Sequence, residues 1–168
     1  MKLKQILLIT GAYLLTTSLL SAPFTDNGDG TVKDNATGLV WQKCTFGKTY
    51  ANGICSGTAS SLNWNSAITS CNGLSLAGKT WRLPNRNELL SIVDYTRTDV
   101  AIDISVFDYS DDYYWSSSTL VYSTGYAWLI NFRTGVIVNG NNISRIYGDC
   151  CYNYTKSSVL YSRCVAGP

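Results

Sequence analysis

The chain has 168 residues, which is enough for one domain with a hydrophobic core, and none of them is histidine. Of its 13 basic side chains, Lys2 and Lys4 fall in an N-terminal segment that we expect to be removed, which leaves 11 basic against 11 acidic. A charge near zero predicts no binding of nucleic acid or of an anionic membrane. The lack of histidine excludes Ser-His-Asp and Cys-His catalysis and the usual zinc sites.

Residues 1–22 have the outline of a signal peptide. Two lysines precede an apolar run over residues 6–20, which is interrupted by threonine, glycine and serine and so does not favour a membrane-spanning anchor. We expect cleavage after Ala22, and Pro23 stands where a lipoprotein would carry its lipidated cysteine. The sequence therefore predicts a secreted, periplasmic or cell-surface protein without a lipid or transmembrane anchor, in which residues 23–168 form a single domain.

The first part of that domain is predicted to form a hairpin over residues 24–42, with strands near 31–32 and 39–41. Residues 26–30, Asp-Asn-Gly-Asp-Gly, resemble the start of a calcium loop. An EF-hand places oxygen ligands at alternate positions and a glutamate at the twelfth, whereas this sequence has glycines and a threonine there. We therefore predict a glycine-rich turn.

Two short amphipathic helices are predicted next. Asn63 is a suitable N-cap for the first, which we expect to end near Asn72-Gly73. For the second, Pro84 prevents an earlier helix start, Asn85 is the N-cap and Glu88 completes a capping box. Apolar residues at helical spacing predict one buried face on each helix. These are Trp64, Ala67, Ile68 and Cys71 in the first and Leu89, Ile92 and Val93 in the second.

Four strands are predicted in the second half, at 113–118, 126–132, 136–139 and 161–165, with a hairpin turn at 133–135. Residues 96–112 and 140–158 lack periodicity and are predicted to be surface loops. Together the elements predict one α+β domain with two helices packed on a mostly antiparallel sheet. The tryptophans assigned to its core are Trp41, Trp81, Trp115 and Trp128.

Six cysteines lie in the exported part, and an even number in such a chain predicts disulfide bonds. Cys44 and Cys55 flank a short loop rich in turn residues, and we expect them to pair with each other. Cys150 and Cys151 are adjacent, and they could form a strained vicinal bridge, remain thiols or link to another chain.

Several separated motifs resemble those of the Lcl C-terminal domain family, a bacterial module of C-type-lectin-like fold, and they occur in the family's order. They are Phe24 to Val32, Asp34 to Cys44, Trp81-Arg-Leu-Pro with Glu88-Leu89, Tyr114-Trp-Ser-Ser-Ser, Ala127-Trp128 with Asn131-Phe132 and Gly135, and Arg163-Cys-Val. The resemblance implies a C-type-lectin-like architecture with a twisted sheet and long surface loops. It also implies a long-range disulfide between Cys71 and Cys164, which the sequence by itself does not select.

Asp108, Asp111 and Asp112 are the candidates for a loose calcium site in the acidic loop. We favour a solvated acidic loop, so no cofactor is expected and calcium is kept only as an alternative. The adjacent pair Asp111-Asp112 does not fit the two-carboxylate arrangement of glycosidases. The mannose-type calcium motifs of C-type lectins, Glu-Pro-Asn and Trp-Asn-Asp, are absent.

Arg82-Leu83-Pro84 also resembles an element of formylglycine-generating enzymes, which share the broader fold. Those enzymes use a C-terminal cysteine pair with several residues between its members, whereas Cys150 and Cys151 are neighbours. We therefore expect no enzymatic activity and keep this enzyme type as an alternative.

Nine of the twelve tyrosines fall between Tyr109 and Tyr161, among serine, asparagine, glycine and aspartate. Tyrosine gives a large rigid contact area, and the small polar residues give adaptable hydrogen bonds, as in antibody binding loops. The alternative is that tyrosine and serine are ordinary on half-buried strands. The candidate ligand-binding residues are Tyr122, Tyr126, Asn139, Asn141, Asn142, Tyr147, Tyr152, Asn153 and Tyr154.

The expected function is a calcium-independent binding or adhesion module, with a glycan or cell-surface polysaccharide as the first ligand class, because adhesins carry domains of this family. A protein ligand comes second, and the composition of residues 109–161 fits a receptor domain diversified by a retroelement. A purely structural envelope domain remains a further alternative.

Overall fold

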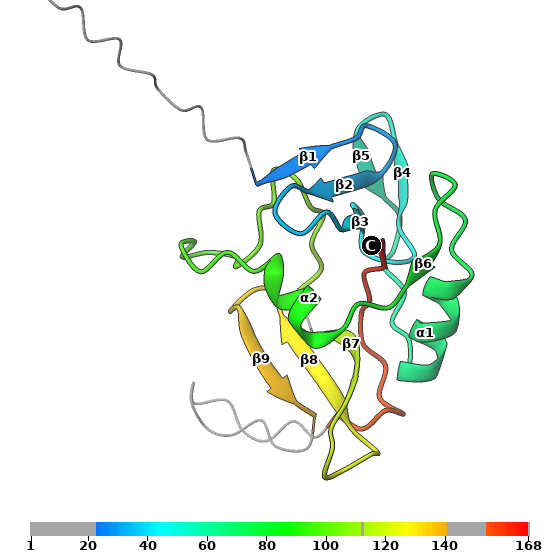
Figure 1. Ribbon diagram of the computed structural model, residues 1–168, viewed down its shortest axis with the longest axis vertical. Coiled ribbons are helices and arrows are strands. Elements are labelled where there is room, and N and C mark those ends of the chain that lie inside the picture. Colours follow the sequence, from blue (N-terminus) through cyan, green and yellow to red (C-terminus); the bar gives the residue numbers. More distant parts are fainter. Residues whose placement is uncertain (1–22, 112, 141–153, 168) are drawn as a thin grey trace, which may run out of the picture.

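The structure, a computed structural model, describes residues 23–111, 113–140 and 154–167. This part of the chain forms three antiparallel sheets and two short helices (Figure 1). It contains no helix with the length and apolarity needed to cross a membrane. The predicted signal peptide, residues 1–22, lies outside the described residues.

The largest sheet brings the beginning and the end of the domain together. Its five strands, in the order β1-β2-β3-β10-β6, are β1 (Phe24–Asp26), β2 (Thr31–Asp34), β3 (Val40–Gln42), β10 (Val165–Ala166) and β6 (Trp81–Arg82). Val165 lies opposite Trp41 on one side and Arg82 on the other. The last strand is thus inserted between two strands that come much earlier in the sequence.

The other two sheets are hairpin structures. The smaller pairs β4 (Thr49–Ala51) with β5 (Ile54–Ser56), and the larger contains β7 (Tyr113–Thr119), β8 (Ala127–Asn131) and β9 (Val136–Asn139) in sequence order. The amide of Gly135 donates a hydrogen bond to the Asn131 carbonyl (2.8 Å), so the predicted hairpin turn at 133–135 is confirmed.

Both predicted helices are present with the expected N-caps. In α1 (Trp64–Asn72), the Asn63 side chain accepts a hydrogen bond from the Ser66 amide (2.9 Å). In α2 (Arg86–Ser91), the side chains of Asn85 and Glu88 each accept a hydrogen bond from the other's backbone amide, so the predicted capping box is confirmed.

The hydrophobic core forms two clusters on either side of the strands. One lies among β2, β3, α2 and β8 and includes Val32, Trp41, Leu89 and Ile130. The other lies against α1 and includes Ala67, Trp81, Trp115 and Leu129. Trp41, Trp81 and Trp115 are buried as predicted, but the prediction for Trp128 was wrong, because this ring is only half buried and has a guanidinium group against it.

Both predicted disulfides are confirmed. Cys44 is bonded to Cys55, with Cα atoms 5.5 Å apart, and Cys71 to Cys164, with Cα atoms 5.4 Å apart. The second bond joins α1 to the residue before β10 and closes a loop of 93 residues. In the chain-entropy treatment such a bond stabilises the fold by roughly 4–5 kcal/mol. Disulfides of this kind are typical of proteins that fold in an oxidising compartment outside the cytosol.

The structure differs from the sequence predictions in three respects. The strands form three sheets rather than one. The strand predicted at 161–165 was wrong except at Val165: Tyr161 makes a single bridge to Tyr114, and the Arg163 side chain turns inward to bond backbone carbonyls. The hairpin of β4 and β5 was missed, although Asn52-Gly53, with φ angles of 51° and 83°, is a typical hairpin turn.

Candidate functional site

Loop 120–126, which connects β7 to β8, presents two apolar side chains directly to solvent. Tyr122 is 98% exposed and Val121 is 80% exposed. Three backbone hydrogen bonds inside the loop, from 3.0 to 3.2 Å long, fix its conformation. Two large neighbouring side chains are therefore exposed to solvent on a loop whose backbone is fixed by hydrogen bonds.

Segment 154–158 lies beside this loop and reinforces it. The amide of Lys156 donates a hydrogen bond to the Gly125 carbonyl (2.9 Å), and Tyr126 and Thr155 form an antiparallel bridge. We refer to loop 120–126 and segment 154–158 together as the hairpin surface. Figure 1 shows both at the same end of the β7–β8 hairpin.

Gly140 allows segment 154–158 to approach the end of β9. Its amide donates to the Ala127 carbonyl (3.2 Å), and its own carbonyl accepts from the Tyr154 amide (2.9 Å). A Cβ atom at residue 140 would lie 2.1 Å from the Tyr154 carbonyl oxygen, which is a severe clash. Glycine is therefore required here by close backbone contact.

Lys156 joins the hairpin surface to α1. Its ammonium group lies 3.7 Å from the centroid of the Trp64 ring and donates a hydrogen bond to the Thr119 hydroxyl (2.8 Å). The Trp64 indole donates in turn to the Ser116 carbonyl (2.8 Å). Burial lowers the pKa of Lys156 from its usual range. These contacts hold the segment in place through one cation–π pair and two hydrogen bonds.

Arg86 makes a second cation–π pair on the other helix. Its guanidinium carbon lies 4.2 Å from the centroid of the Trp128 ring, and its backbone amide donates to the Ser118 hydroxyl (3.0 Å). The Arg86 Nε atom is buried without a hydrogen-bond partner. Neither cation–π pair was foreseen, because nothing in the local sequence brings Arg86 to Trp128 or Lys156 to Trp64.

Four of the nine predicted ligand-binding residues are described, and the structure brings them to one end of the hairpin. Tyr122 is fully exposed, whereas Tyr126, Asn139 and Tyr154 are half buried. Asn139 lies opposite Trp128 in the sheet, and the Tyr154 ring packs against the Tyr113 ring with centroids 5.2 Å apart. The other five lie outside the described residues, as do Cys150 and Cys151; they are Asn141, Asn142, Tyr147, Tyr152 and Asn153.

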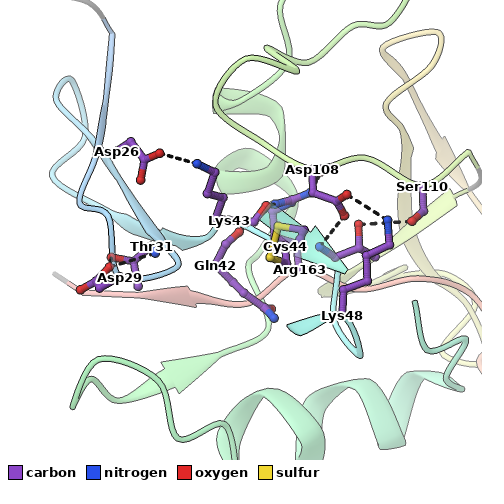
Figure 2. The surroundings of a disulfide bond; sticks show 12 residues. Asp26, Asp29, Thr31, Gln42, Lys43, Cys44, Lys48, Asp108, Ser110 and Arg163 are labelled. Carbon is purple, nitrogen blue, oxygen red and sulfur yellow. Dashed lines mark hydrogen bonds and ion pairs between the residues drawn. A yellow bond between two sulfur atoms is a disulfide. The ribbon is translucent and has the colours of Figure 1, made fainter. Parts of the chain in front are cut away.

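The acidic residues considered for calcium are engaged in other contacts. The carboxylate of Asp108 accepts hydrogen bonds from the Lys48 ammonium (2.9 Å) and the Thr45 amide (3.1 Å), as Figure 2 shows for Lys48. Asp111 is paired with Arg133 and with the Tyr109 hydroxyl, and burial together with that hydrogen bond raises the pKa of Tyr109. Asp112 lies outside the described residues. Among the residues that are described, no three metal-ligating side chains lie close enough together to hold an ion.

The glycine-rich turn at 26–30 is confirmed. Gly28 and Gly30 have φ angles of 76° and 86°, which glycine adopts readily. The Asp26 carboxylate is bound by the Gly28 amide and by Lys43, an ion pair drawn in Figure 2, and Asp29 accepts from the amide and hydroxyl of Thr31. These carboxylates stabilise the turn.

Comparison with known proteins gives one family. The model of the family described as the Lcl C-terminal domain matches residues 30–165. This range is most of the 168-residue chain and includes every helix and strand from β2 to β9. No curated protein matches the sequence.

Proposed function

We propose that this chain, which belongs to the Lcl C-terminal domain family, is an exported binding module whose ligand contacts the hairpin surface. The observation that carries the proposal is the position of Tyr122, 98% exposed at the tip of a loop with a fixed backbone. We further propose that the α+β arrangement, with its long-range disulfide between Cys71 and Cys164, is a C-type-lectin-like fold.

A rigid loop supports binding because little conformational entropy is lost when a ligand docks. The backbone of loop 120–126 is already ordered by its internal hydrogen bonds and by segment 154–158. Tyrosine has few rotatable bonds, so its ring is immobilised at a lower cost than a long flexible side chain. The backbone that carries Tyr122 is therefore ordered before a ligand arrives.

A glycan is the ligand class that we propose. The exposed ring of Tyr122 offers an apolar face to the C–H face of a sugar, and its hydroxyl offers a hydrogen bond. Ser123 and Thr124 follow directly in the same loop and add hydroxyl groups at its tip. The contacts of Asp108 and Asp111 with lysine and arginine support a binding mode that does not use calcium.

A protein ligand is the second candidate, and Val121 is the observation that favours it. Val121, which is 80% exposed, adds apolar area beside the exposed Tyr122, and tyrosine is enriched in protein interfaces. The neighbouring Tyr122 would then act as an anchor in a pocket of the partner. Removing the Val121 side chain should weaken the binding of a protein ligand but not that of a glycan.

The proposal is tested by a binding screen against glycans and polysaccharides, with the oxidised protein, in calcium and in a chelator. We expect a ligand whose binding survives chelation, is lost in Tyr122→Ala and is retained in Val121→Ser. If no glycan binds, the same variants are tested against candidate protein ligands, and a protein whose binding is lost in both variants would favour the second candidate. Binding that is unchanged in Tyr122→Ala would contradict the proposed location.

A further inference from the structure

A groove of about 440 Å³ lies far from the hairpin surface, beyond the C-terminal end of α2. Its lining comes from the chain around β1, from the end of α2 and from the loop that follows α2. The residues that line it are Pro23, Phe24, Ser91, Ile92, Val93, Asp94, Tyr95, Thr96 and Asp103. Its size falls in the range of roughly 300–1,000 Å³ that is typical of small-molecule sites.

The groove lies at the opposite end of β8 from loop 120–126. The Tyr95 hydroxyl donates to the carbonyl of Gly135, in the turn that follows β8 (3.3 Å), whereas loop 120–126 precedes β8. A ligand in the groove would therefore be separate from one on the hairpin surface. The inference below goes beyond the proposed function and does not depend on it.

The floor of the groove is apolar and one wall is aromatic. Ile92 is buried, and the Phe24 ring packs edge-on against Phe107 with centroids 5.1 Å apart. Tyr95 is 70% exposed, and its hydrogen bond to Gly135 fixes the end of the ring. The groove can therefore hold the apolar part of a ligand on its floor and place another part of the ligand against the Tyr95 ring.

Two carboxylates complete the lining and are held in fixed orientations. One oxygen of Asp94 accepts from the amide (3.0 Å) and hydroxyl (2.6 Å) of Thr96, and one oxygen of Asp103 accepts from the same groups of Ser105 at the same distances. The hydrogen bonds from Thr96 lower the pKa of Asp94, so this group is charged at neutral pH.

Neither carboxylate is neutralised by an ion pair with a basic side chain of the described chain. Arg97 is near Asp94, but its guanidinium is bound to the Val100 carbonyl (2.9 Å) and to Asp99 (3.4 Å). An anionic ligand would be repelled by the groove, whereas a cation would be attracted by both carboxylates. The complementary ligand is a cation with an apolar body.

We propose that this groove binds an organic ammonium group, either a quaternary ammonium or the primary ammonium of a short aliphatic amine. The apolar substituents pack on Phe24, Ile92 and Val93, the cation lies near the Tyr95 ring, and Asp94 and Asp103 supply the opposite charge. Both types of ligand carry a positive charge and apolar carbon groups. They differ in that a primary ammonium donates hydrogen bonds to the carboxylates and a quaternary ammonium does not.

The test uses the disulfide-bonded protein with residues kept before Pro23, because a chain that begins at Pro23 would place its own terminal ammonium group beside the groove. The protein is titrated with choline, with n-butylammonium and with 3,3-dimethylbutan-1-ol, the uncharged carbon analogue of choline. Binding is followed by calorimetry and by amide chemical shifts. We expect at least one ammonium ion to bind, and the uncharged analogue to bind roughly tenfold more weakly or worse, because it lacks the charge that the two carboxylates attract. Stronger binding of choline would identify a quaternary ammonium as the ligand, and stronger binding of n-butylammonium would identify a primary ammonium.

The decisive variant is Asp94→Asn combined with Asp103→Asn. Asparagine keeps the side-chain oxygen that accepts from Thr96 or Ser105, so the loop conformation is retained while both charges are removed. The matched control is Asp29→Asn, which removes an exposed charge from a carboxylate that accepts from the amide and hydroxyl of Thr31 in the same way but does not line the groove. We expect a loss of roughly tenfold or more in the double variant and none in the control.

Equal binding of choline and its uncharged analogue would overturn the proposal, as would no binding of either ammonium ion at millimolar concentrations. Unchanged affinity in the double variant would also overturn it. Tyr122→Ala should leave ammonium binding intact, and Tyr95→Ala should leave glycan binding intact. Each site thus serves as the control for the other.

Discussion

Gly140 and Tyr154 are in direct backbone contact: the Tyr154 amide donates to the Gly140 carbonyl (2.9 Å), and a Cβ at residue 140 would lie 2.1 Å from the Tyr154 carbonyl oxygen. Because Tyr154 begins the segment that lies beside loop 120–126, this contact positions one half of the hairpin surface. The end of β9 therefore positions segment 154–158 of the proposed binding surface.

Gly140→Ala should displace segment 154–158 and lower the free energy of unfolding by about 1–3 kcal/mol, because the added methyl group meets backbone rather than a mobile side chain. Urea denaturation measures the change. Gly125→Ala is the matched control: no atom lies within 4 Å of its Cβ, so we expect a change below about 0.5 kcal/mol. Equal effects of the two substitutions would contradict the close-contact explanation.

The two disulfides should differ in their contribution to stability. Cys71–Cys164 closes 93 residues and Cys44–Cys55 closes 11, which correspond to roughly 4–5 and about 3 kcal/mol in the chain-entropy treatment. Replacing each pair by alanine and comparing urea midpoints tests the order. A larger loss for the short loop would show that local packing around Cys44, rather than loop closure, determines the effect.

Glu88 should make the fold sensitive to acid. Burial acts to raise its pKa, but hydrogen bonds from Arg82 and from the Asn85 amide outweigh burial, and the pKa of Glu88 lies below its ordinary value of 4.5. Because the folded state holds the proton less tightly than the unfolded state, this stabilisation is present above about pH 4.5 and is lost as the pH falls through the folded value.

Glu88→Gln tests this expectation, because glutamine keeps the capping box but cannot titrate. We expect its urea midpoint to fall less steeply than that of the natural protein below pH 4.5. Arg82→Met should flatten the same part of the profile, since it removes both hydrogen bonds from the guanidinium to Glu88 (2.7 Å each). Profiles that stay parallel in all three proteins would rule out a contribution from this pair.

Arg163 should be essential for stability although it lies in no regular strand. It is fully buried, and its guanidinium donates to the carbonyls of Gln42, Lys43 and Asp108. Arg163→Met would remove all three of these hydrogen bonds, although the Lys43 carbonyl would still accept from the Asp108 amide (3.1 Å). At about 1 kcal/mol for each bond, we expect a loss of about 3 kcal/mol. Arg133→Met, which removes an exposed ion pair with Asp111, should cost less than about 1 kcal/mol by the same denaturation measurement.

Local features of the fold could be predicted from the sequence because their causes are local. Asn63 and Asn85 mark the helix starts since an N-cap and its amide donor are three residues apart. The pairing of Cys71 with Cys164 came from the family resemblance, and the family assignment is confirmed. The predicted glycan binding and export stay predictions.

The contacts that position the candidate sites could not be predicted, because they join residues far apart in sequence. Arg86 reaches Trp128 and Lys156 reaches Trp64 only after the sheets and helices have packed. The prediction of a strand at 161–165 was wrong for the same reason. The Arg163 side chain is buried among three carbonyls from distant segments, and the local sequence pattern did not indicate this. The groove at Asp94 and Asp103 is likewise assembled from separate segments.

The most direct test of the central claim is the affinity of Tyr122→Ala for the glycan found in the screen, measured together with its thermal unfolding. A side chain that is 98% exposed contributes little to stability, so we expect an unchanged melting temperature. If the ring is the main contact, affinity should fall by roughly tenfold or more. Unchanged affinity in a normally folded Tyr122→Ala protein would show that the hairpin surface is not the binding site.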